Sequence, residues 1–448
     1  MQKHREDNAM QDEIIRRCIL EFRDIGIPDF IPREVDVPIL KNMVTTIVGA
    51  RKVGKTYLTY QLIDQFIRQK HIPSLKHVCY LHFDDERLLE MQLPDLRRID
   101  QIFLELSSAS PKDKLLFVFD EIHRIPDWEF FALRLNRNPN WHVIVTGSSA
   151  DLEEDKVGKQ LKGKTFTTRL YPLSFREFLR FSTEDVPRKK SLSTSDAAQL
   201  SRNFREYMKT GSYPAVHEVR PENHRDLLRQ YFNSIVASDF VDNRDVRHPL
   251  SCKIYLRNLL QRNACPYTHK KERNILASMG HAMSPTTITD WFSGAVESYF
   301  IGVSTINSPS VKKQEQNYRK IYAVDWALAN AVNAFGDRRT PHALEAIIYW
   351  HLQRMGFLTP YALVGSDKQE VDFVAGLPDQ LPSLAVQVCM DVSAPDVLDR
   401  ESRALDGFVA AMDVEPLILT LDDPPSGLSS KYPIEKAYEW CLRATGAG

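Results

Sequence analysis

The 448-residue chain is long enough for about two to four domains with sizeable cores. Its 58 lysines and arginines nearly balance its 59 aspartates and glutamates, so overall charge indicates neither a nucleic-acid nor a membrane partner, and a polyanion site would be a local patch. Six scattered cysteines without a C-x-x-C pair favour reduced thiols over a disulfide framework or a zinc site. The charged N-terminus lacks a signal-peptide apolar region, and no run approaches the roughly 20 apolar residues that span a bilayer. We therefore expect a soluble cytoplasmic protein that is not membrane-bound.

Residues 1–30 predict an amphipathic helix, and residues 27–38 predict an extended lead-in to the next domain. The apolar positions of the helix share one face: Ile14, Ile15, Cys18, Ile19 and Phe22. We expect this helix to pack against the domain that follows rather than to recruit a partner.

A short apolar strand at 44–48 is followed by the sequence GARKVGKT at 49–56 and by an amphipathic helix at 57–68. The octapeptide fits the P-loop pattern G-x-x-x-x-G-K-[ST] at every fixed position. With glycine at about 7% of residues, a chance match somewhere in the chain is on the order of one per cent. Strand, loop and helix follow one another in the order that a nucleotide-binding P-loop requires.

The chemistry of a phosphate site explains these residue types. Loop amides and the helix N-terminus form a cradle for phosphate oxygens, and Gly49 and Gly54 permit the close backbone approach. We expect Lys55 to reach the β- and γ-phosphates and Thr56 to ligate Mg²⁺. The expected nucleotide-binding residues are Gly49, Ala50, Arg51, Lys52, Val53, Gly54, Lys55, Thr56 and Tyr57.

Two further strands end in acidic residues. The strand expected at 77–83 ends in the cluster 84–87, at the sheet edge where α/β proteins bind ligands, although a solvated turn explains this cluster nearly as well. The apolar run 114–121 ends in Asp120 and Glu121, as a Walker B strand does. We expect Asp120 to hold Mg²⁺ and Glu121 to orient or deprotonate the attacking water.

A fourth strand, expected at 142–146, ends in a Gly-Ser-Ser turn. A hydroxyl at this strand end would lie between the two Walker strands and could sense the γ-phosphate; we choose Ser148 over Thr146 and Ser149. The alternative is that the serine caps a helix beginning near Ala150, and one serine can do both. The expected catalytic residues are thus Glu121, Lys55 and Ser148.

A fifth strand is expected at 166–170, and Ser174 followed by Glu177 forms a capping box at the start of the next helix. Strands alternating with helices predict an α/β domain with a P-loop NTPase parallel sheet over residues 31–181.

Six segments carry a more specific signal: IPREVDVP (31–38), GARKVGKT (49–56), FDDERL (83–88), FDEIH (119–123), VTGSSA (145–150) and YPLSFREFL (171–179). Together they resemble a family of AAA-superfamily ATPases, widespread in archaea and bacteria, with a C-terminal domain of uncharacterised function. The resemblance covers nearly the whole chain and implies ATP and Mg²⁺ as ligands. Members usually carry Arg-Arg in the loop and Gly-Arg before the fifth strand, whereas this chain has Lys52 and Lys164 at the second position of each pair. Because lysine lacks the bidentate fork of arginine, no arginine finger is assigned here, and Arg169 is a fallback candidate.

Beyond residue 181 we expect a linker and helices at 182–250 and a winged-helix-like region at 251–335. Polar residues at 181–199 are typical of a linker, and helices are expected at 200–209 and 224–241. A segment T-x-x-x-W-F-x-x-x-V-E-x-Y-F beginning at Thr287 resembles the second helix of a winged-helix unit. The basic residues nearby could contact DNA phosphates or form a solvated surface: Lys270, Lys271, Arg273, Lys312, Lys313 and Arg319.

The last region, 336–448, is expected to be a small α/β domain. Its predicted elements, in order, are a helix at 342–355, strands at 358–363, 370–375 and 384–390, a helix at 396–412 and a strand at 416–421. This order resembles the PD-(D/E)XK nuclease core, in which a helix Glu, a strand Asp and an E-x-K triplet bind Mg²⁺ and activate water.

The nuclease pattern is incomplete in this chain. Glu345 and Asp372 match, but the triplet has Gln387 and Cys389 at its outer positions. Glutamine is a weak ligand for a hard cation, and cysteine cannot replace the lysine ammonium. A degenerate nuclease fold with a structural or binding role is favoured, while Glu401 could supply a displaced carboxylate and keeps activity open.

These predictions combine into an intracellular ATPase in which binding and hydrolysis of Mg-ATP switch the arrangement of the C-terminal domains. Two alternatives remain open: an ATP-regulated DNA nuclease, in defence or mobile-element control, and a non-catalytic, nucleotide-dependent regulator that binds DNA or a protein. Many AAA-type sites are completed by an arginine from a neighbouring subunit, so a homo-oligomer is plausible, although no residue establishes it.

Overall fold

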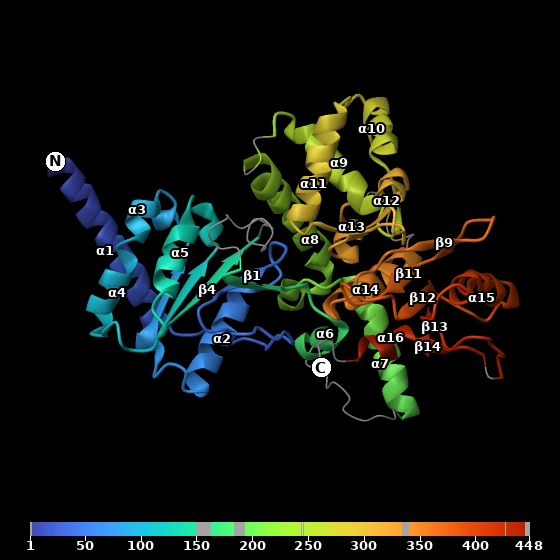
Figure 1. Ribbon diagram of the computed structural model, residues 1–448, viewed down its shortest axis with the longest axis horizontal. Coiled ribbons are helices and arrows are strands. Elements are labelled where there is room, and N and C mark those ends of the chain that lie inside the picture. Colours follow the sequence, from blue (N-terminus) through green and yellow to red (C-terminus); the bar gives the residue numbers. More distant parts are fainter. Residues whose placement is uncertain are drawn as a thin grey trace. The chain divides into compact units, whose positions relative to one another are not determined.

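The computed structural model describes residues 2–148, 163–182, 193–242, 244, 246–333, 340–425 and 427–443 (Figure 1). The chain divides into two compact units, Met1–Leu170 and Tyr171–Gly448. Residues 171–182, which follow the predicted ATPase strands, thus group with the C-terminal unit. Within the part of the chain that the structure describes, none of the helices combines the length and the apolar character needed to cross a bilayer.

The N-terminal unit is built on a five-stranded sheet with the order β2-β3-β4-β1-β5. Every neighbouring pair of strands is parallel. All residues of β1 and β3 are buried, as expected for parallel strands covered on both faces. The predicted parallel sheet is confirmed. The strands are β1 (Val44–Val48), β2 (Val78–His82), β3 (Leu115–Asp120), β4 (Trp141–Gly147) and β5 (Thr165–Arg169).

Helices flank this sheet (Figure 1). Helix α2 packs against β3 and β4, α5 against β4 and β1, and α1 against α4 and β2. The packing of α1 is the one expected from its apolar face, because Ile15 and Ile19 are fully buried. The helices are α1 (Gln2–Ile25), α2 (Lys55–Arg68), α3 (Leu93–Leu96), α4 (Ile99–Ser107) and α5 (Trp128–Asn136).

The C-terminal unit begins with helices. The predicted capping box is confirmed, because the Glu177 amide donates to the Ser174 hydroxyl and the Ser174 amide donates to the Glu177 carboxylate. The helix expected at 224–241 is α-helical only as far as Ile235. The residues that follow, Val236–Asp242, are π-helical. The helices are α6 (Phe175–Phe181), α7 (Thr194–Thr210), α8 (His224–Ile235), α9 (Pro249–Gln261), α10 (His269–Ser278), α11 (Pro285–Glu297), α12 (Val311–Gln316) and α13 (Trp326–Ala331).

A three-stranded antiparallel sheet lies among these helices and was not predicted from the sequence. Its order is β6-β8-β7, with β6 at Cys265–Tyr267, β7 at Ile301–Ser304 and β8 at Arg319–Ala323. Strands this short carry too few residues for an alternating pattern to stand out. Helix α11 begins two residues before Thr287, on the segment likened to a winged-helix unit, and that likeness stays a prediction.

The last part of the chain forms a four-stranded sheet with the order β11-β12-β13-β14. β11 pairs antiparallel with β12, and the other pairs are parallel. The predicted order of helix, strands, helix and strand is observed, whereas the nuclease assignment stays a prediction. The elements are α14 (Thr340–Arg354), β9 (Ala362–Val364), β10 (Gln369–Val371), β11 (Phe373–Ala375), β12 (Leu384–Cys389), α15 (Pro395–Val409), β13 (Glu415–Thr420), β14 (Ile434–Lys436) and α16 (Ala437–Cys441).

Two of the strand predictions in this region were wrong in their bounds. The strand expected at 370–375 is broken at Asp372: β10 pairs with β9 in a hairpin, whereas β11 pairs with β12. The strand expected at 358–363 is reduced to β9 and an isolated bridge between Leu358 and Gly376. Buried apolar residues, Val371 and Phe373, flank the break on both sides, so composition alone does not reveal it.

Candidate functional site

The P-loop, residues 49–56, connects β1 to α2 and depends on both of its glycines. Gly49 has φ +154°, and a Cβ there would lie 2.2 Å from the carbonyl oxygen of Leu170. Gly54, with φ 97°, precedes the first residue of α2 in the left-handed region that favours glycine. The loop therefore directs the N-terminus of α2, with its free amides, toward the end of β1.

Lys55 lies folded over this loop. Its Nζ donates to the carbonyl oxygens of Gly49, at 3.2 Å, and Ala50, at 3.3 Å, and pairs with Glu121 Oε1 at 3.3 Å. The side chain is only 4% exposed. An anion bound on the loop amides would meet this ammonium, as a nucleotide phosphate does in a P-loop.

Asp120 accepts hydrogen bonds from several hydroxyl groups around the site. Fully buried at the end of β3, it accepts hydrogen bonds from Thr56 Oγ1 at 2.6 Å, from the Tyr80 hydroxyl at 3.1 Å and from the Thr146 hydroxyl. His82 Nε2 lies 3.4 Å from the same carboxylate. The Thr56 and Asp120 oxygens lie side by side. Both are hard oxygen ligands, so their chemistry fits a Mg²⁺ ion.

Glu121 occupies an unusual backbone position for a charged residue, with φ 57°. Its amide donates to Thr146 Oγ1 at 3.0 Å, and its carboxylate lies between Lys55 and His123 Nδ1, the latter at 3.4 Å. Burial raises the pKa of Glu121, but the charges of Lys55, His123 and Arg51 outweigh burial and lower it to about 2. Glu121 is therefore an ionised carboxylate whose charge is balanced by its neighbours.

The structure brings most of the predicted nucleotide-site residues together: the loop 49–56, Asp120 and Glu121 meet at one end of the sheet. Tyr57 follows the loop and is 48% exposed. Ser148 is buried directly after β4, whereas Thr146, the alternative hydroxyl, contacts both Asp120 and Glu121. Ser149 and the helix expected near Ala150 lie outside the described residues.

Sequence reasoning did not assign a role to four residues that contact the site: Arg33, Tyr80, His82 and His123. Tyr80 and His82 lie on β2, the strand that pairs with the predicted Walker B strand β3, and His123 follows β3 closely. These places in the sequence could have indicated that the three residues lie near the nucleotide site. Burial lowers the pKa of His123, although Glu121 opposes this shift, so the imidazole faces Glu121 in its neutral form near neutral pH.

Arg33 connects the lead-in segment to the loop. Its Nη1 donates to the Val53 carbonyl oxygen at 2.7 Å, and its amide donates to Gln61 Oε1 at 2.8 Å. The side-chain Nε2 of Gln61 donates a hydrogen bond to the Arg33 carbonyl oxygen at 3.2 Å. A side chain on α2 thus pairs with the lead-in backbone as a neighbouring strand would, and the guanidinium supports the loop.

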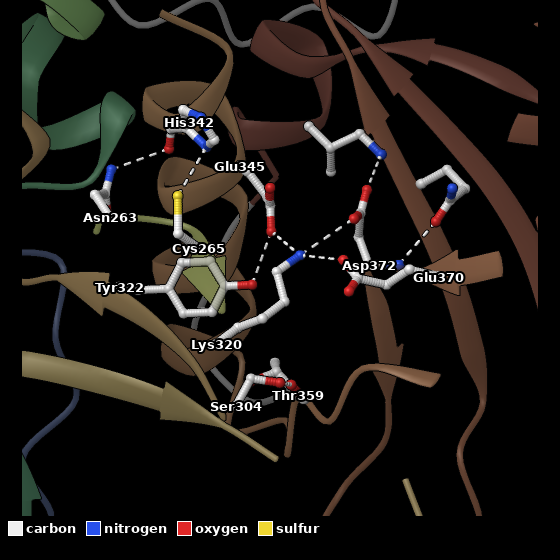
Figure 2. Close-up of polar contacts among 12 residues, drawn as sticks. Asn263, Cys265, Ser304, Lys320, Tyr322, His342, Glu345, Thr359, Glu370 and Asp372 are labelled. Carbon is white, nitrogen blue, oxygen red and sulfur yellow. Dashed lines mark hydrogen bonds and ion pairs between the residues drawn. The ribbon is translucent and has the colours of Figure 1, made fainter. Parts of the chain in front are cut away.

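A second cluster of charged side chains lies in the C-terminal unit (Figure 2). There Lys320 Nζ from β8 pairs with Glu345 Oε1 of α14 at 2.5 Å, Glu370 Oε1 of β10 at 2.7 Å and Asp372 Oδ1 at 3.3 Å. The lysine side chain is 3% exposed. We call Lys320, Glu345, Glu370 and Asp372 the Lys320 cluster.

Glu345 and Asp372, the two residues that match the nuclease pattern, are thus brought together, and Gln387 lies next to them. Gln387 Oε1 accepts from the Asp372 amide at 2.7 Å, and its Nε2 donates to Glu401 at 2.6 Å. Cys389 Sγ contacts the Leu419 carbonyl oxygen at 3.9 Å instead. Among the described residues, no group of three or more His, Cys, Asp and Glu side chains is arranged to hold a metal ion.

Comparison with known protein families finds two matches in the chain. Residues 41–179 match the family model described as AAA domain, and residues 201–339 match a domain of unknown function, DUF8612. An uncharacterized protein of Methanocaldococcus jannaschii is 28% identical over 400 residues, which cover 88% of this chain and 85% of that relative. An uncharacterized protein of Haemophilus influenzae is 26% identical over 354 residues, covering 78% and 83%.

Among solved structures, a Walker-type ATPase of Pyrococcus abyssi matches 64% of this chain and 90% of its own, with 15% identity and a TM-score of 0.36. The family model and the five-stranded parallel sheet with its P-loop agree. Residues 41–179 therefore form an AAA-type P-loop ATPase domain, and a domain of unknown function follows it.

Proposed function

We propose that this protein binds and hydrolyses Mg-ATP at the loop 49–56 and uses the cycle to change the arrangement of its C-terminal domains. One observation carries the ATPase proposal: Lys55 and Thr56 of the loop contact Glu121 and Asp120 at the end of β3. A phosphate-binding lysine, a hydroxyl and two acidic residues thus converge at one edge of the sheet, which is the constellation that NTP hydrolysis requires.

Each residue has a distinct role in this proposal. The loop amides and Lys55 bind the phosphates, while Thr56 and Asp120 would hold Mg²⁺. The bound ion would neutralise charge on the β- and γ-phosphate oxygens. Ser148 and Thr146 are the candidate hydroxyls that sense the γ-phosphate, and Thr146 is favoured by its bonds to both acidic residues.

The pairing of Glu121 with Lys55 suggests how hydrolysis is kept dependent on substrate. A carboxylate with a pKa of about 2 is a poor proton acceptor. A phosphate group that takes over the Lys55 ammonium removes the largest of the charges that lower this pKa, and burial then raises it. Glu121 would become a stronger base at the moment when the γ-phosphate and its attacking water are in place.

Two substitutions test the proposal by nucleotide binding and phosphate release measured on the full chain. Lys55→Ala should abolish ATP binding because it removes the ammonium that meets the phosphates. Glu121→Gln should retain ATP binding and lose turnover, since the amide cannot accept a proton. Unchanged hydrolysis by Glu121→Gln would contradict the role assigned to Glu121, and unchanged binding by Lys55→Ala would contradict the phosphate site.

A nucleotide-dependent DNA-binding role is a second candidate. Lys270 and Lys271 on α10 and Lys312 and Lys313 on α12 are all exposed. Exposed lysines that contact phosphates release counterions, so binding would weaken steeply with salt. Electrophoretic mobility shift with and without ATP tests this role, and replacing these four lysines by glutamine should abolish any shift.

A further inference from the structure

The Lys320 cluster joins parts of the fold that are far apart in the sequence. Lys320 belongs to the antiparallel sheet β6-β8-β7, whereas its three partners belong to α14, to β10 and to the break between β10 and β11. Figure 2 shows the ammonium pointing into the space between Glu345 and Asp372, with Glu370 beside them. The lysine therefore reaches the carboxylates from a separate sheet.

We propose that the Lys320 ammonium is the resident cation of this carboxylate cluster, in the place where a nuclease site would hold a divalent metal ion. A metal ion bound by Glu345 and Asp372 would sit about 2.1 Å from their oxygens and would compete for the lone pairs that Lys320 uses. The C-terminal domain accordingly holds these carboxylates together without a metal and does not cleave nucleic acid.

Other donors of the chain itself contact Glu345 Oε1, which Lys320 also pairs with, and the second oxygens of Glu370 and Asp372. The Tyr322 hydroxyl donates to Glu345 Oε1 at 2.8 Å, and the Tyr318 hydroxyl donates to Glu370 Oε2 at 2.5 Å. The Val388 amide donates to Asp372 Oδ2 at 2.9 Å. Partly buried carboxylates that accept several such hydrogen bonds are stable without an external ligand.

The neighbouring residues point away from metal binding as well. The Gln387 amide is committed to the Asp372 backbone and to Glu401, and Arg400 pairs with Glu401 at 2.6 Å. The third ligand and the lysine of a nuclease triplet are thus both missing from β12. Lys320 compensates for the charge of the carboxylates but comes from the opposite side of the cluster.

The proposal predicts a gain of binding when the lysine is removed. Lys320→Ala leaves three partly buried carboxylates beside an empty volume, which is a site suited to a small dication. Mn²⁺ binding to the full chain, measured without nucleotide by titration calorimetry, should show one more ion for Lys320→Ala than for the wild type. We expect a Kd on the order of 0.1 mM, as for other carboxylate sites of moderate rigidity.

Matched variants make the outcome decisive. Adding Glu345→Gln to Lys320→Ala should remove the extra ion, while wild type and Asp372→Asn should bind Mn²⁺ in equal number. A wild-type ion that is lost in Asp372→Asn would overturn the proposal, because the cluster would then hold a metal beside the lysine. An unchanged ion count in a folded Lys320→Ala would overturn it too.

If Lys320→Ala does not fold, a variant that also lacks two of the carboxylates takes its place. Lys320→Met combined with Glu345→Gln and Glu370→Gln removes the cation together with two anions, and it should melt at a higher temperature than Lys320→Met alone. Equal or lower melting would contradict the role of Lys320 as counter-ion. Plasmid incubated with wild type, Mg²⁺ or Mn²⁺ and ATP should stay intact; cleavage that Asp372→Ala abolishes would also overturn the proposal.

Discussion

Two buried lysines contact carboxylates in the part of the chain that the structure describes, and their surroundings differ in kind. Lys55 pairs with one carboxylate, Glu121, and otherwise rests on two carbonyl oxygens of its own loop. Lys320 pairs with three carboxylates from two separate segments, α14 and residues 370–372. In the proposed function the first lysine would exchange its partner for a phosphate without unpacking the fold, whereas the second is held by elements that would have to separate.

The same contrast appears in the electrostatics of the carboxylates. The charges around Glu121 outweigh its burial and lower its pKa to about 2. Burial raises the pKa of Asp372 to about 8, because Lys320 is opposed by Glu345 and Glu370 and cannot compensate fully for both. Although burial alone would lower the pKa of Lys320, the surrounding groups raise it well above its ordinary value. The charges around Glu121 thus favour its ionised form, whereas the cluster around Asp372 has more carboxyl groups than its single lysine can compensate.

The largest effect is expected for turnover at the first cluster. Glu121→Gln should reduce ATP hydrolysis on the order of 10³-fold, because general-base catalysis typically contributes a factor of this size. ATP affinity should stay within a few-fold of wild type. Steady-state phosphate release and equilibrium nucleotide binding measure the two quantities separately, and Glu345→Gln in the second cluster is the control that should leave both unchanged.

A large loss of stability is expected when the second cluster loses its cation. Lys320→Met should lower the free energy of unfolding of the C-terminal unit by about 3 kcal/mol or more, since buried carboxylates are left without their counter-ion. Lys55→Met should cause a smaller loss, because only Glu121 loses a pairing. Urea denaturation of both variants measures this difference, and equal losses would remove the distinction between the two lysines.

Asp372 and Glu121 should also change the stability of the fold in different pH ranges. The folded-state pKa of Asp372 lies above its ordinary value of 3.8. Protonation of Asp372 therefore contributes its full stabilisation below about pH 4, and this contribution is lost as the pH rises through about 8. Stability should therefore fall as the pH rises toward about 8. Urea midpoints of wild type and Asp372→Asn check this, because the amide cannot titrate and should flatten the slope.

Glu121→Gln is the matched control for that slope. The folded-state pKa of Glu121 lies below its ordinary value of 4.5, so its contribution to stability is present above that value and is lost as pH falls through about 2. Replacing Glu121 should leave the slope near neutral pH unchanged. A slope that persists in Asp372→Asn and disappears in Glu121→Gln would reverse the comparison.

The N-terminal site could be predicted from sequence because its signals are local. The loop 49–56 is a contiguous motif, and Asp120 and Glu121 end an apolar run whose burial follows from its composition. In a parallel sheet such strand ends lie at one edge, so motif and strand order together bring the residues into contact. The hydroxyl between the strands was narrowed to three candidates but not fixed, since its choice depends on side-chain direction.

The Lys320 cluster could not be predicted in this way because its contacts are long-range. Lys320 follows Arg319 in a polar stretch that is typical of an exposed surface, and its partners lie 25 to 52 positions farther along the chain. The break at Asp372 has apolar residues on both sides and is not marked by a turn signal, and the short β8 gives no clear alternation. Only the pairing of β8 within its own sheet directs Lys320 toward α14.

The smallest effect is expected for Arg33, which supports the loop that carries Lys55. Arg33→Ala should weaken ATP binding by about 1 kcal/mol, because the guanidinium no longer holds the Val53 carbonyl oxygen while the backbone pairing with Gln61 persists. Gln61→Ala keeps the guanidinium contact and removes that pairing. If Lys55 is placed by the loop, as the comparison requires, Arg33→Ala should weaken nucleotide binding more than Gln61→Ala does. Equal effects in nucleotide titrations would show that the lead-in segment as a whole, rather than its contact with the loop, supports the exchangeable lysine.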